Sequence, residues 1–254
     1  MIDIHCHILP GIDDGAKNIE DSLNMARAAV KQGIHTIIAT PHHQNSKYLN
    51  PKEDILLKVS ELNEAIQEEN ISITILPGQE TRIYGEILED YNNNEILPLN
   101  HSNYLFIELP SGHVPRYTQQ LLYDIQLQGL IPIIVHPERN QEIIERPEIL
   151  FQFVEKGALT QVTAASISGA FGKKIKEFSF QLIDASLTHF LASDAHNISN
   201  RNFKVVEAFD LVEKRYGVDT VDMFLENAEY LVSGKSVFKD IPTKVKRKKI
   251  LGIF

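Results

Sequence analysis

The chain has 254 residues but only one cysteine, and it contains no long apolar run. The single cysteine, Cys6, excludes an internal disulfide and gives no indication of secretion. No apolar stretch approaches the roughly 18 residues of a membrane helix, and the N-terminus lacks a signal-peptide pattern. From these absences we expect a soluble protein of the cytoplasm.

An excess of positive charge is also missing. The 25 lysines and arginines are outnumbered by 34 aspartates and glutamates, so the net charge is −9. This balance argues against a nucleic-acid binder, because the binding surface of such a protein is basic.

Positive charge is concentrated near the C-terminus, where the pattern of the rest of the chain has ended. Residues 244–249 carry five positive charges in six positions, within a C-terminal extension that we place at 237–254. Such a block is usually a solvated tail. It could instead dock on an acidic membrane surface or an acidic partner, and the sequence leaves both possibilities open. The oligomeric state is not indicated.

Glycine-rich phosphate-binding motifs are absent too. Neither G-x-G-x-x-G nor a P-loop occurs, which argues against an open, doubly wound nucleotide-binding sheet. Short apolar runs alternate instead with helical patterns, as in parallel strands covered on both faces. This alternation predicts an α/β protein with one β/α barrel domain over residues 1–236. The predicted strands are 2–5, 36–40, 71–76, 104–109, 131–136, 159–163 and 189–193.

Two helix starts carry capping signals. Asn18 precedes an apolar stripe at helical spacing, and Gly33 follows its end. Asn50 stands before Pro51 and Glu53, which predicts a helix capped by Asn50 with the proline in its first turn.

Residue types that bind metals follow six of the predicted strands directly. In a barrel the C-terminal strand ends converge on one face, where active sites lie. His-x-His and Asp-x-His each place two side chains on the same side, because alternate residues of a strand point the same way. Nine candidates are too many for one ion and fit two or three, and imidazole with carboxylate suits Mn, Fe, Zn or Co. The candidates are His5, His7, Asp14, His42, Glu80, Glu108, His136, Asp194 and His196.

The other histidines have weaker claims. His35 and His189 precede or begin strands and are expected to be structural, and His101 lies in a connecting loop. His43 could support His42 from behind, and His113 could line the mouth of the site.

The charge of the candidate site indicates an anionic substrate. Four carboxylates contribute −4 and three divalent ions would contribute +6, which leaves about +2 and suits a phosphate monoester dianion. Arg139 and Arg201 follow ligand-bearing strands, and guanidinium groups bind phosphate oxygens in pairs. Arg116 and Arg82 are weaker candidates for the same task.

Five motifs in this order resemble the polymerase-and-histidinol-phosphatase (PHP) superfamily of metal phosphoesterases. The opening, with His5, His7 and the 11–15 segment Gly-Ile-Asp-Asp-Gly, resembles its protein-tyrosine phosphatase branch, found with capsular and exopolysaccharide genes. The resemblance implies the PHP fold, a distorted (β/α)7 TIM-like barrel, with three divalent ions, often manganese. The motifs are Ile-His-Cys-His at 4–7, Thr-Pro-His at 40–42, Gly-Gln-Glu at 78–80, His-Pro-Glu-Arg at 136–139 and Ser-Asp-Ala-His at 193–196.

The resemblance also implies a distribution of ligands among the ions. His5, His7, Glu80 and Asp194 would surround one ion, Asp14, His42 and His196 a second, and Glu108 and His136 a third, with Glu80 bridging. Arg139 and Arg201 would hold phosphate.

The implied activity is hydrolysis of protein phosphotyrosine by metal-activated hydroxide. The implied partner is a bacterial tyrosine kinase with a phosphorylated C-terminal tail that controls polysaccharide synthesis. The thiolate mechanism is excluded, because Cys-x5-Arg would need an arginine at position 12, which is Ile12. The alternative is histidinol-phosphate phosphatase or another small-molecule phosphomonoesterase of the superfamily. A metal-dependent amidohydrolase and a catalytically silent docking domain are the remaining rivals.

Overall fold

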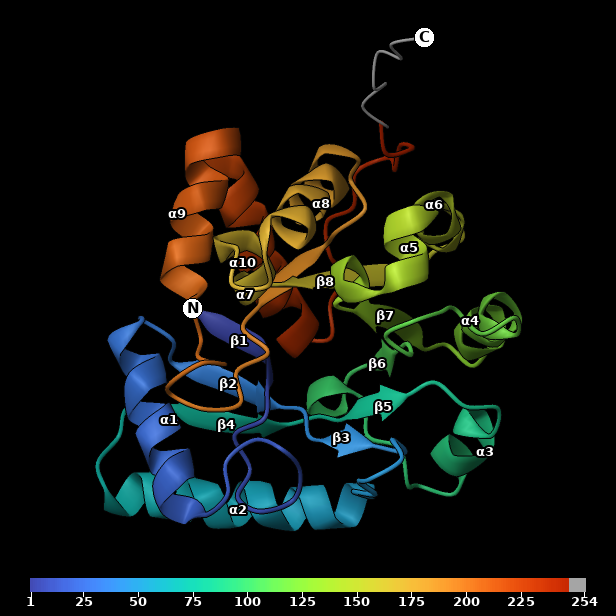
Figure 1. Cartoon of the computed structure of the whole chain (residues 1–254). Coiled ribbons are helices and arrows are strands. Elements are labelled where there is room, and N and C mark those ends of the chain that lie inside the picture. Colours follow the sequence, from blue (N-terminus) through green and yellow to red (C-terminus); the bar gives the residue numbers. More distant parts are fainter. Residues whose placement is uncertain (247–254) are drawn as a thin grey trace, which may run out of the picture.

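The computed structural model describes residues 1–246, and its strands pair into two fully parallel sheets. One has the order β1–β2–β4 and the other the order β3–β5–β6–β7–β8–β9 (Figure 1). The strands are β1 (Ile2–Cys6), β2 (Thr36–Ala39), β3 (His42–His43), β4 (Thr74–Pro77), β5 (Glu80–Arg82), β6 (Tyr104–Glu108), β7 (Ile131–Val135), β8 (Leu159–Thr163) and β9 (Phe190–Ala192).

Two of the predicted strands continue beyond a break, which explains why the described region has nine strands rather than seven. The chain breaks at Pro41, between β2 and β3, and at Gly78, between β4 and β5. At both places it passes from the first sheet to the second. Gly78 is required here, because a Cβ atom would lie 2.6 Å from the Ile38 side chain. In the new register His42 pairs with Glu80, so two candidate ligands stand side by side.

The α/β class and the single domain are confirmed, whereas closure into one barrel is not shown. The two sheets approach each other where β1 and β9 end. There the backbone N–H of Asp194 donates to the His5 carbonyl at 2.9 Å, and the N–H of His7 donates to the Ala195 carbonyl at 2.9 Å. An isolated parallel bridge between Cys6 and Ala195 accompanies these bonds.

Helices surround the sheets on the outside (Figure 1). α2 packs on β4 and α1 on α2, while α10 packs on both β1 and β9. The helices are α1 (Ile19–Lys31), α2 (Lys52–Glu68), α3 (Ile87–Asn92), α4 (Thr118–Leu127), α5 (Gln141–Glu145), α6 (Glu148–Glu155), α7 (Ala164–Ser168), α8 (Lys173–Asp184), α9 (Val205–Tyr216) and α10 (Val218–Val232), with 3-10 turns at Leu99–His101 and Pro137–Arg139.

One of the two capping predictions is confirmed and the other is wrong. The Asn18 side chain accepts the N–H of Asp21 at 2.9 Å, as expected for the cap of α1. The residue that caps α2 is Pro51, and it makes no side-chain capping bond. Asn50 instead donates to the carbonyls of Ile12 and His42 at 3.0 and 2.8 Å. Its amide therefore ties together two loops near the strand ends.

The buried strands form the core. Every residue of β6 is buried, as are all residues of β8 and β9. This burial on both faces explains the continuous apolar runs in the sequence. Polar residues inside the core are concentrated at the C-terminal ends of the strands, and their placement is described below.

The chain after α10 runs back along the body of the protein. Val237 is buried, and the N–H of Thr243 donates to the Ala185 carbonyl at 2.8 Å. Lys244 lies over the ring of Phe151 at 5.8 Å, while the basic residues 247–249 fall outside the described region. The division at residues 236 and 237 stays a prediction. Within residues 1–246 no helix is both long and apolar enough to cross a bilayer.

Candidate metal centre

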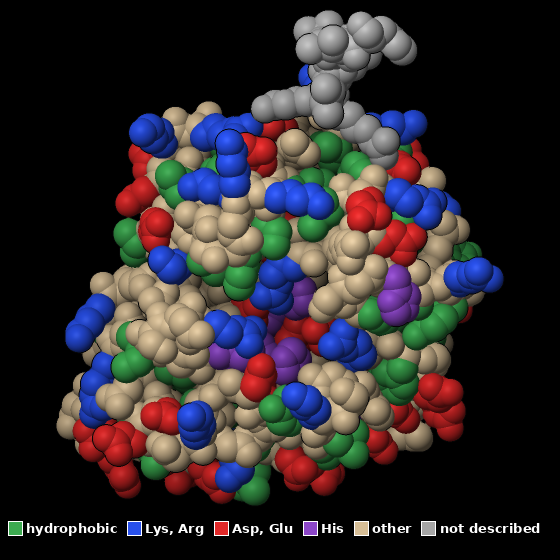
Figure 2. Space-filling model, viewed as in Figure 1, with side chains coloured by type: hydrophobic (Ala, Val, Ile, Leu, Met, Phe, Trp, Pro, Cys, Tyr) green, Lys and Arg blue, Asp and Glu red, His purple; other side chains and the backbone are tan. Residues whose placement is uncertain are grey.

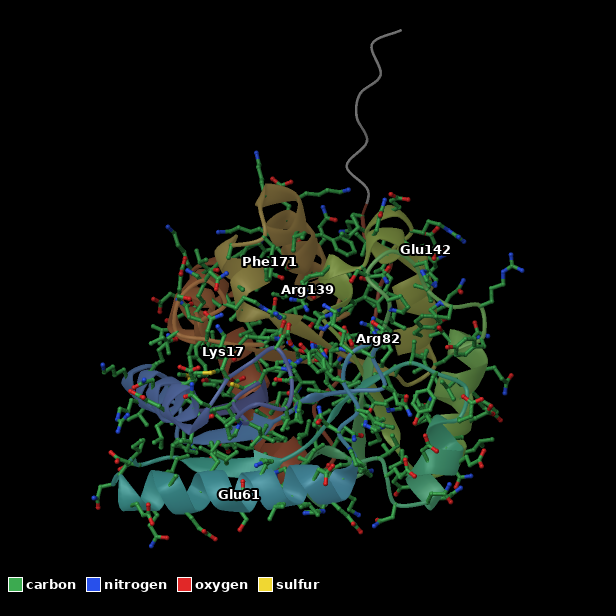
Figure 3. All side chains as sticks on the ribbon, turned by 60° about the horizontal axis from the view of Figure 1, so that its bottom comes forward. Lys17, Glu61, Arg82, Arg139, Glu142 and Phe171 are labelled. Carbon is green, nitrogen blue, oxygen red and sulfur yellow. The ribbon has the colours of Figure 1, made fainter. Side chains whose placement is uncertain are left out.

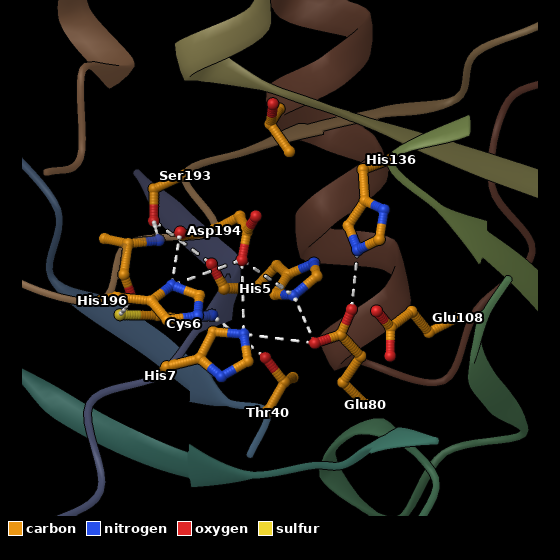
Figure 4. A network of polar contacts seen from close by, with 12 residues as sticks. His5, Cys6, His7, Thr40, Glu80, Glu108, His136, Ser193, Asp194 and His196 are labelled. Carbon is orange, nitrogen blue, oxygen red and sulfur yellow. Dashed lines mark hydrogen bonds and ion pairs between the residues drawn. The ribbon is translucent and has the colours of Figure 1, made fainter. Parts of the chain in front are cut away.

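The nine sequence candidates meet at one place, where the strands end. Figure 2 shows a hollow in which histidine and acidic side chains lie together, with lysine and arginine side chains around it. Figure 4 shows side chains from several strand ends pointing toward one another. Seven of the nine form three overlapping groups, and within each group the ligand atoms lie within 4.8 Å of one another: His7, Asp14, His42 and His196; His5, His7 and Glu80; and His42, Glu80 and Glu108.

Glu80 lies at the centre of the cluster and is fully buried. Its Oε2 is 2.9 Å from Nδ1 of His42, 3.2 Å from Nε2 of His7 and 3.4 Å from Nε2 of His5. Its Oε1 is 2.8 Å from Nε2 of His136. One carboxylate therefore faces four imidazoles, the arrangement expected of a bridging ligand.

The two carboxylate oxygens of Asp194 have different neighbours, histidines on one side and arginines on the other. Oδ1 is 3.3 Å from Nε2 of His7 and 3.5 Å from Nε2 of His5. Oδ2 is 2.8 Å from Nη1 of Arg139 and 3.7 Å from Nη2 of Arg201. Both predicted phosphate-binding arginines thus reach the same edge of the cluster, although they are 62 positions apart in the sequence. Arg139 is labelled in Figure 3.

The remaining carboxylates close the cluster on two other sides. Oδ1 of Asp14 lies 3.3 Å from Nε2 of His196 and 3.4 Å from Nε2 of His42. Oε2 of Glu108 lies 3.7 Å from Nδ1 of His42. The other oxygen of Glu108 pairs with Arg82 at 3.2 Å. Arg82, a weaker sequence candidate, therefore also lies at the rim.

Two candidate ligands have left-handed backbones. His136 has a φ of 36° and Asp194 a φ of 52°, values that cost energy for residues other than glycine. Each is held by a hydrogen bond across the strand ends, from His136 N–H to the Gln161 carbonyl at 2.7 Å and from Asp194 N–H to the His5 carbonyl at 2.9 Å. Strain of this kind is concentrated at functional sites, where the surrounding structure enforces it.

Asp13 fixes the orientation of one histidine and the loop around it. Its Oδ2 lies 2.7 Å from Nδ1 of His7 and accepts the backbone N–H of His42 at 3.2 Å. Its Oδ1 accepts the N–H of Gly15 at 2.8 Å. Because an ionised carboxylate only accepts, Nδ1 of His7 carries a proton toward Asp13, which leaves Nε2 as the ring atom available to a metal ion beside Glu80.

His5 and His196 are oriented in the same way by neutral acceptors. Nδ1 of His5 lies 2.8 Å from Oε1 of Gln161, whose amide nitrogen donates to the Val162 carbonyl. Nδ1 of His196 lies 2.9 Å from the backbone carbonyl of Asp194. In both rings the Nε2 atom is left free to accept, as a metal ligand must be.

The atoms that face the centre have no hydrogen-bond partner. Buried polar atoms are almost always paired, so a cluster of unpaired ones needs an explanation. Divalent cations supply it, because imidazole nitrogen and carboxylate oxygen are their ordinary ligands. The residues present therefore fit bound metal. The unpaired atoms are Nε2 of His5, His7 and His196, Nδ1 of His42, Oε2 of Glu80 and Glu108, and Oδ1 of Asp194.

The ionisable groups shift one another's pKa values strongly. Burial opposes the charge of Glu80, but His42 and His5 outweigh burial and hold its pKa well below the usual value. Burial likewise opposes a charged His42, yet the negative charge of Glu80 raises the His42 pKa to about 10. Burial and the charge of Glu80 raise the pKa of Glu108 to about 7. The negative charge of Glu80 therefore favours positive charge beside it, as at His42.

The histidines expected to be structural lie apart from this cluster. His35 is exposed and contacts Thr36, and His101 is exposed in its 3-10 turn. His189 is buried at the opposite ends of the strands. His43 is buried but its ring nitrogens bond none of the nine candidates, so the structure does not support a role behind His42.

The two outer candidates at the mouth are exposed. Among the described residues, His113 and Arg116 contact no candidate ligand. The backbone carbonyl of His113 accepts a hydrogen bond from the Asn140 side chain.

The sequence argument missed Asp13 and Gln161, which orient His7 and His5. A signal for Asp13 existed, since it directly precedes the candidate Asp14, but no periodic pattern indicates Gln161.

Fold and site together define an α/β protein with a candidate metal centre bordered by arginines. The family model for capsular polysaccharide synthesis, CpsB/CapC, matches residues 1–233. The chain therefore belongs to the CpsB/CapC family.

Two curated relatives span the whole chain. Tyrosine-protein phosphatase YwqE from Bacillus subtilis is 52% identical over 254 residues, and CapC from Staphylococcus aureus is 39% identical, each over 100% of both chains. A solved structure, described as one of YwqE from Bacillus subtilis and CpsB from Streptococcus pneumoniae, "unique metal-dependent tyrosine phosphatases", matches with a TM-score of 0.95 and 52% identity. It covers 97% of this chain and 100% of that chain.

Proposed function

We propose that this protein is a metal-dependent protein-tyrosine phosphatase. The observation that carries the proposal is the set of unpaired imidazole nitrogens and carboxylate oxygens that converge beside Arg139 and Arg201. The relatives named as tyrosine phosphatases support the same activity. The small-molecule alternative, histidinol-phosphate phosphatase, is not favoured by these relatives.

Three divalent ions, with manganese as the first candidate, would occupy the centre. Iron, zinc, cobalt or magnesium are the other candidates for the same nitrogen and oxygen donors. The three groups of ligand atoms support this count. Glu80 would be shared between ions, since both of its oxygens face imidazoles. The ligand set is His5, His7, Asp14, His42, Glu80, Glu108, His136, Asp194 and His196.

Arg139 and Arg201 would bind the phosphate oxygens. Both guanidinium groups lie against Oδ2 of Asp194, the oxygen that faces away from His5 and His7. A phosphate placed at this edge would contact both arginines, and guanidinium binds phosphate oxygens bidentately. The two positive charges would stabilise the charge that develops on the transferred group.

Bound divalent ions would supply the nucleophile, because they lower the pKa of water and can neutralise charge on phosphoryl oxygens. Little help is needed for the leaving group, since the phenol of tyrosine has a pKa of about 10. Cys6 takes no part. Its buried thiol donates to the Ala195 carbonyl at 3.5 Å, and burial raises its pKa well above the ordinary value.

Several finer features belong to the same proposal. The substrate would be a phosphotyrosine protein, in particular a bacterial tyrosine kinase with a phosphorylated C-terminal tail that acts in capsule or exopolysaccharide synthesis. The enzyme would work in the cytoplasm. The strands would close as a distorted (β/α)7 barrel, and the bridge between Cys6 and Ala195 supports this closure.

The test is hydrolysis of a phosphotyrosine peptide by the full chain with and without divalent metal. We expect chelation to abolish phosphate release, added manganese to restore it, and Cys6→Ser to retain most of it. Activity that survives exhaustive chelation but is lost on alkylation of Cys6 would overturn the proposal.

A further inference from the structure

A groove opens directly beside the candidate metal centre. It has a volume of about 420 Å³, and its lining includes Asp14 and His196. These two residues also belong to the cluster, with Nε2 of His196 3.3 Å from Oδ1 of Asp14. The groove therefore adjoins the cluster at Asp14 and His196 and extends away from it.

Both walls of the groove are held firmly by the fold. One wall is the loop before α1. A Cβ on Gly15 would lie 2.0 Å from the His7 carbonyl oxygen, so the loop can pack this closely only with glycine. The other wall is the turn after His196, in which the Asn197 side chain accepts the N–H groups of Ser199 and Arg201.

The lining is mixed in a way that suits a polypeptide. Ala16 and Met25 are buried in it and offer an apolar floor, while Asn24 and Asn200 offer amide groups that can bond a peptide backbone. Such a combination of an apolar floor with a few polar groups is typical of binding clefts.

Lys17 is the one lining residue with a free positive charge. Among the described residues its ammonium group makes no ion pair, whereas Arg82, Arg139 and Arg201 are all paired with carboxylates of the cluster. Asp21, which also lines the groove, accepts the backbone N–H of Lys17 at 3.2 Å and makes no ion pair with its ammonium group.

We infer that this groove binds the polypeptide adjacent to the phosphotyrosine and that Lys17 selects substrates with an acidic side chain there. The inference rests on the proposed phosphatase function, and it names a determinant of substrate choice outside the metal ligands. Arg201 lies between the groove and the cluster, with Nη1 3.1 Å from Oδ2 of Asp14. A phosphotyrosine held by Arg201 would therefore place a neighbouring residue within the groove.

The experiment compares Lys17→Glu with wild-type protein on three substrates. The first is a phosphotyrosine peptide with glutamates beside the tyrosine, and the second is the same peptide with alanines there. The third is p-nitrophenyl phosphate, which is too short to reach from the metal centre into the groove. Lys31→Glu is the matched control, because it makes the same charge change at the opposite end of α1. Asn24→Trp narrows the groove without changing charge.

For Lys17→Glu we expect kcat/KM on the acidic peptide to fall about three- to tenfold, mainly through KM, because an exposed attraction becomes a repulsion. The loss should shrink at high salt. Hydrolysis of p-nitrophenyl phosphate should stay within about twofold. Asn24→Trp should weaken both peptides alike and leave the small substrate unchanged.

Three outcomes would overturn the inference. They are equal losses on the acidic peptide and on p-nitrophenyl phosphate, no loss on any substrate, and an equal loss in Lys31→Glu. Failure of the proposed function is distinguishable, because the wild-type protein would then hydrolyse neither phosphotyrosine peptide.

Discussion

Buried histidines at the two ends of the parallel strands differ in whether their ring nitrogens have hydrogen-bond partners. At the N-terminal side of β9, His189 is 3% exposed and its Nδ1 accepts the backbone N–H of Thr160 at 3.1 Å. At the C-terminal ends, His5 and His7 are equally buried, but their Nε2 atoms have no hydrogen-bond partner. The same residue type therefore stabilises the fold at one end and is kept available for a ligand at the other.

The C-terminal ends of the strands contain features that lower the stability of the fold when no ligand is bound. An unpaired buried polar group costs about 1–3 kcal/mol, and the C-terminal end contains several of them within a few ångströms. Two left-handed residues, His136 and Asp194, add backbone strain at the same end. Cations would offset these costs, so we expect the two ends to respond differently to metal and to mutation.

The largest loss is expected from Glu80→Gln. Glu80 contacts His5, His7, His42 and His136. An amide would remove the negative charge at the centre of these imidazoles and leave one neutral oxygen where two charged ones can bind metal. Phosphatase activity should fall by more than the roughly 10- to 100-fold that follows loss of an outer partner of a metal ligand. The measurement is kcat/KM on a phosphotyrosine peptide at saturating manganese. Retention of a tenth of the activity would remove Glu80 from the centre.

Next in size are the effects of Arg139→Ala and Arg201→Ala. A charge-assisted hydrogen bond contributes about 1.5–3 kcal/mol, so each change should lower kcat/KM roughly 10- to 150-fold. Manganese affinity should change little, because neither arginine is a ligand. Kinetics on p-nitrophenyl phosphate together with metal titration separate the two effects. Unchanged kinetics in either variant would exclude that arginine from phosphate binding.

Asp13→Asn tests how the orientation of His7 contributes. The new amide can donate to Nδ1 of His7, which favours the ring form whose Nε2 carries the proton and cannot bind metal. Manganese affinity should fall about 10- to 100-fold. Excess manganese should restore activity, which it should not do for Arg139→Ala.

Asp21→Asn is the control for Asp13→Asn. It is the same isosteric change on neighbouring α1, at a carboxylate that contacts no candidate ligand in the described chain. Metal binding in this control should match the wild type. Equal affinity in Asp13→Asn and Asp21→Asn would contradict the role of Asp13.

The smallest expected effect concerns the N-terminal end of the strands. Burial, with a smaller contribution from the charge of Lys239, lowers the pKa of His189 to about 3. Because the unfolded chain takes up this proton near pH 6.5 and the folded chain does not, stability is lost as pH falls below 6.5. At pH 5 the loss amounts to about 2 kcal/mol.

His189→Asn keeps an acceptor for Thr160 without the titration. Relative to wild type, the variant should gain about 2 kcal/mol in unfolding free energy between pH 7.5 and pH 5, measured by urea denaturation. Its phosphatase activity should stay within about twofold. A stability difference that is independent of pH would show that His189 is not held neutral by the fold.

Most of the strands and most residues of the candidate site could be predicted from the sequence. All nine candidate ligands meet, because parallel strands bring their C-terminal ends to one face whatever the distance along the chain. Apolar runs could not show that the chain would break at Pro41 and Gly78 and start β3 and β5 in the second sheet. These breaks set His42 opposite Glu80, and the one at Gly78 depends on close packing against Ile38, a residue 40 positions earlier in the chain.

The missed details are all side-chain hydrogen bonds that local sequence patterns do not show. Asn50 looked like a helix cap from its neighbours, but its amide bonds the carbonyls of Ile12 and His42. Asp13 and Gln161 orient histidines across 6 and 156 positions of sequence, distances over which no periodicity extends. Local patterns therefore predict which residues reach the site, whereas tertiary hydrogen bonds decide how they are turned.

Anomalous scattering from crystals of the full chain soaked in manganese tests the central claim most directly. We expect strong peaks among the atoms of His5, His7, Glu80 and Asp194 that have no hydrogen-bond partner. The side chains of Asp13 and Gln161 should keep their contacts with the outer nitrogens of the rings. A catalytically active crystal whose strand ends show no anomalous peak would contradict the account.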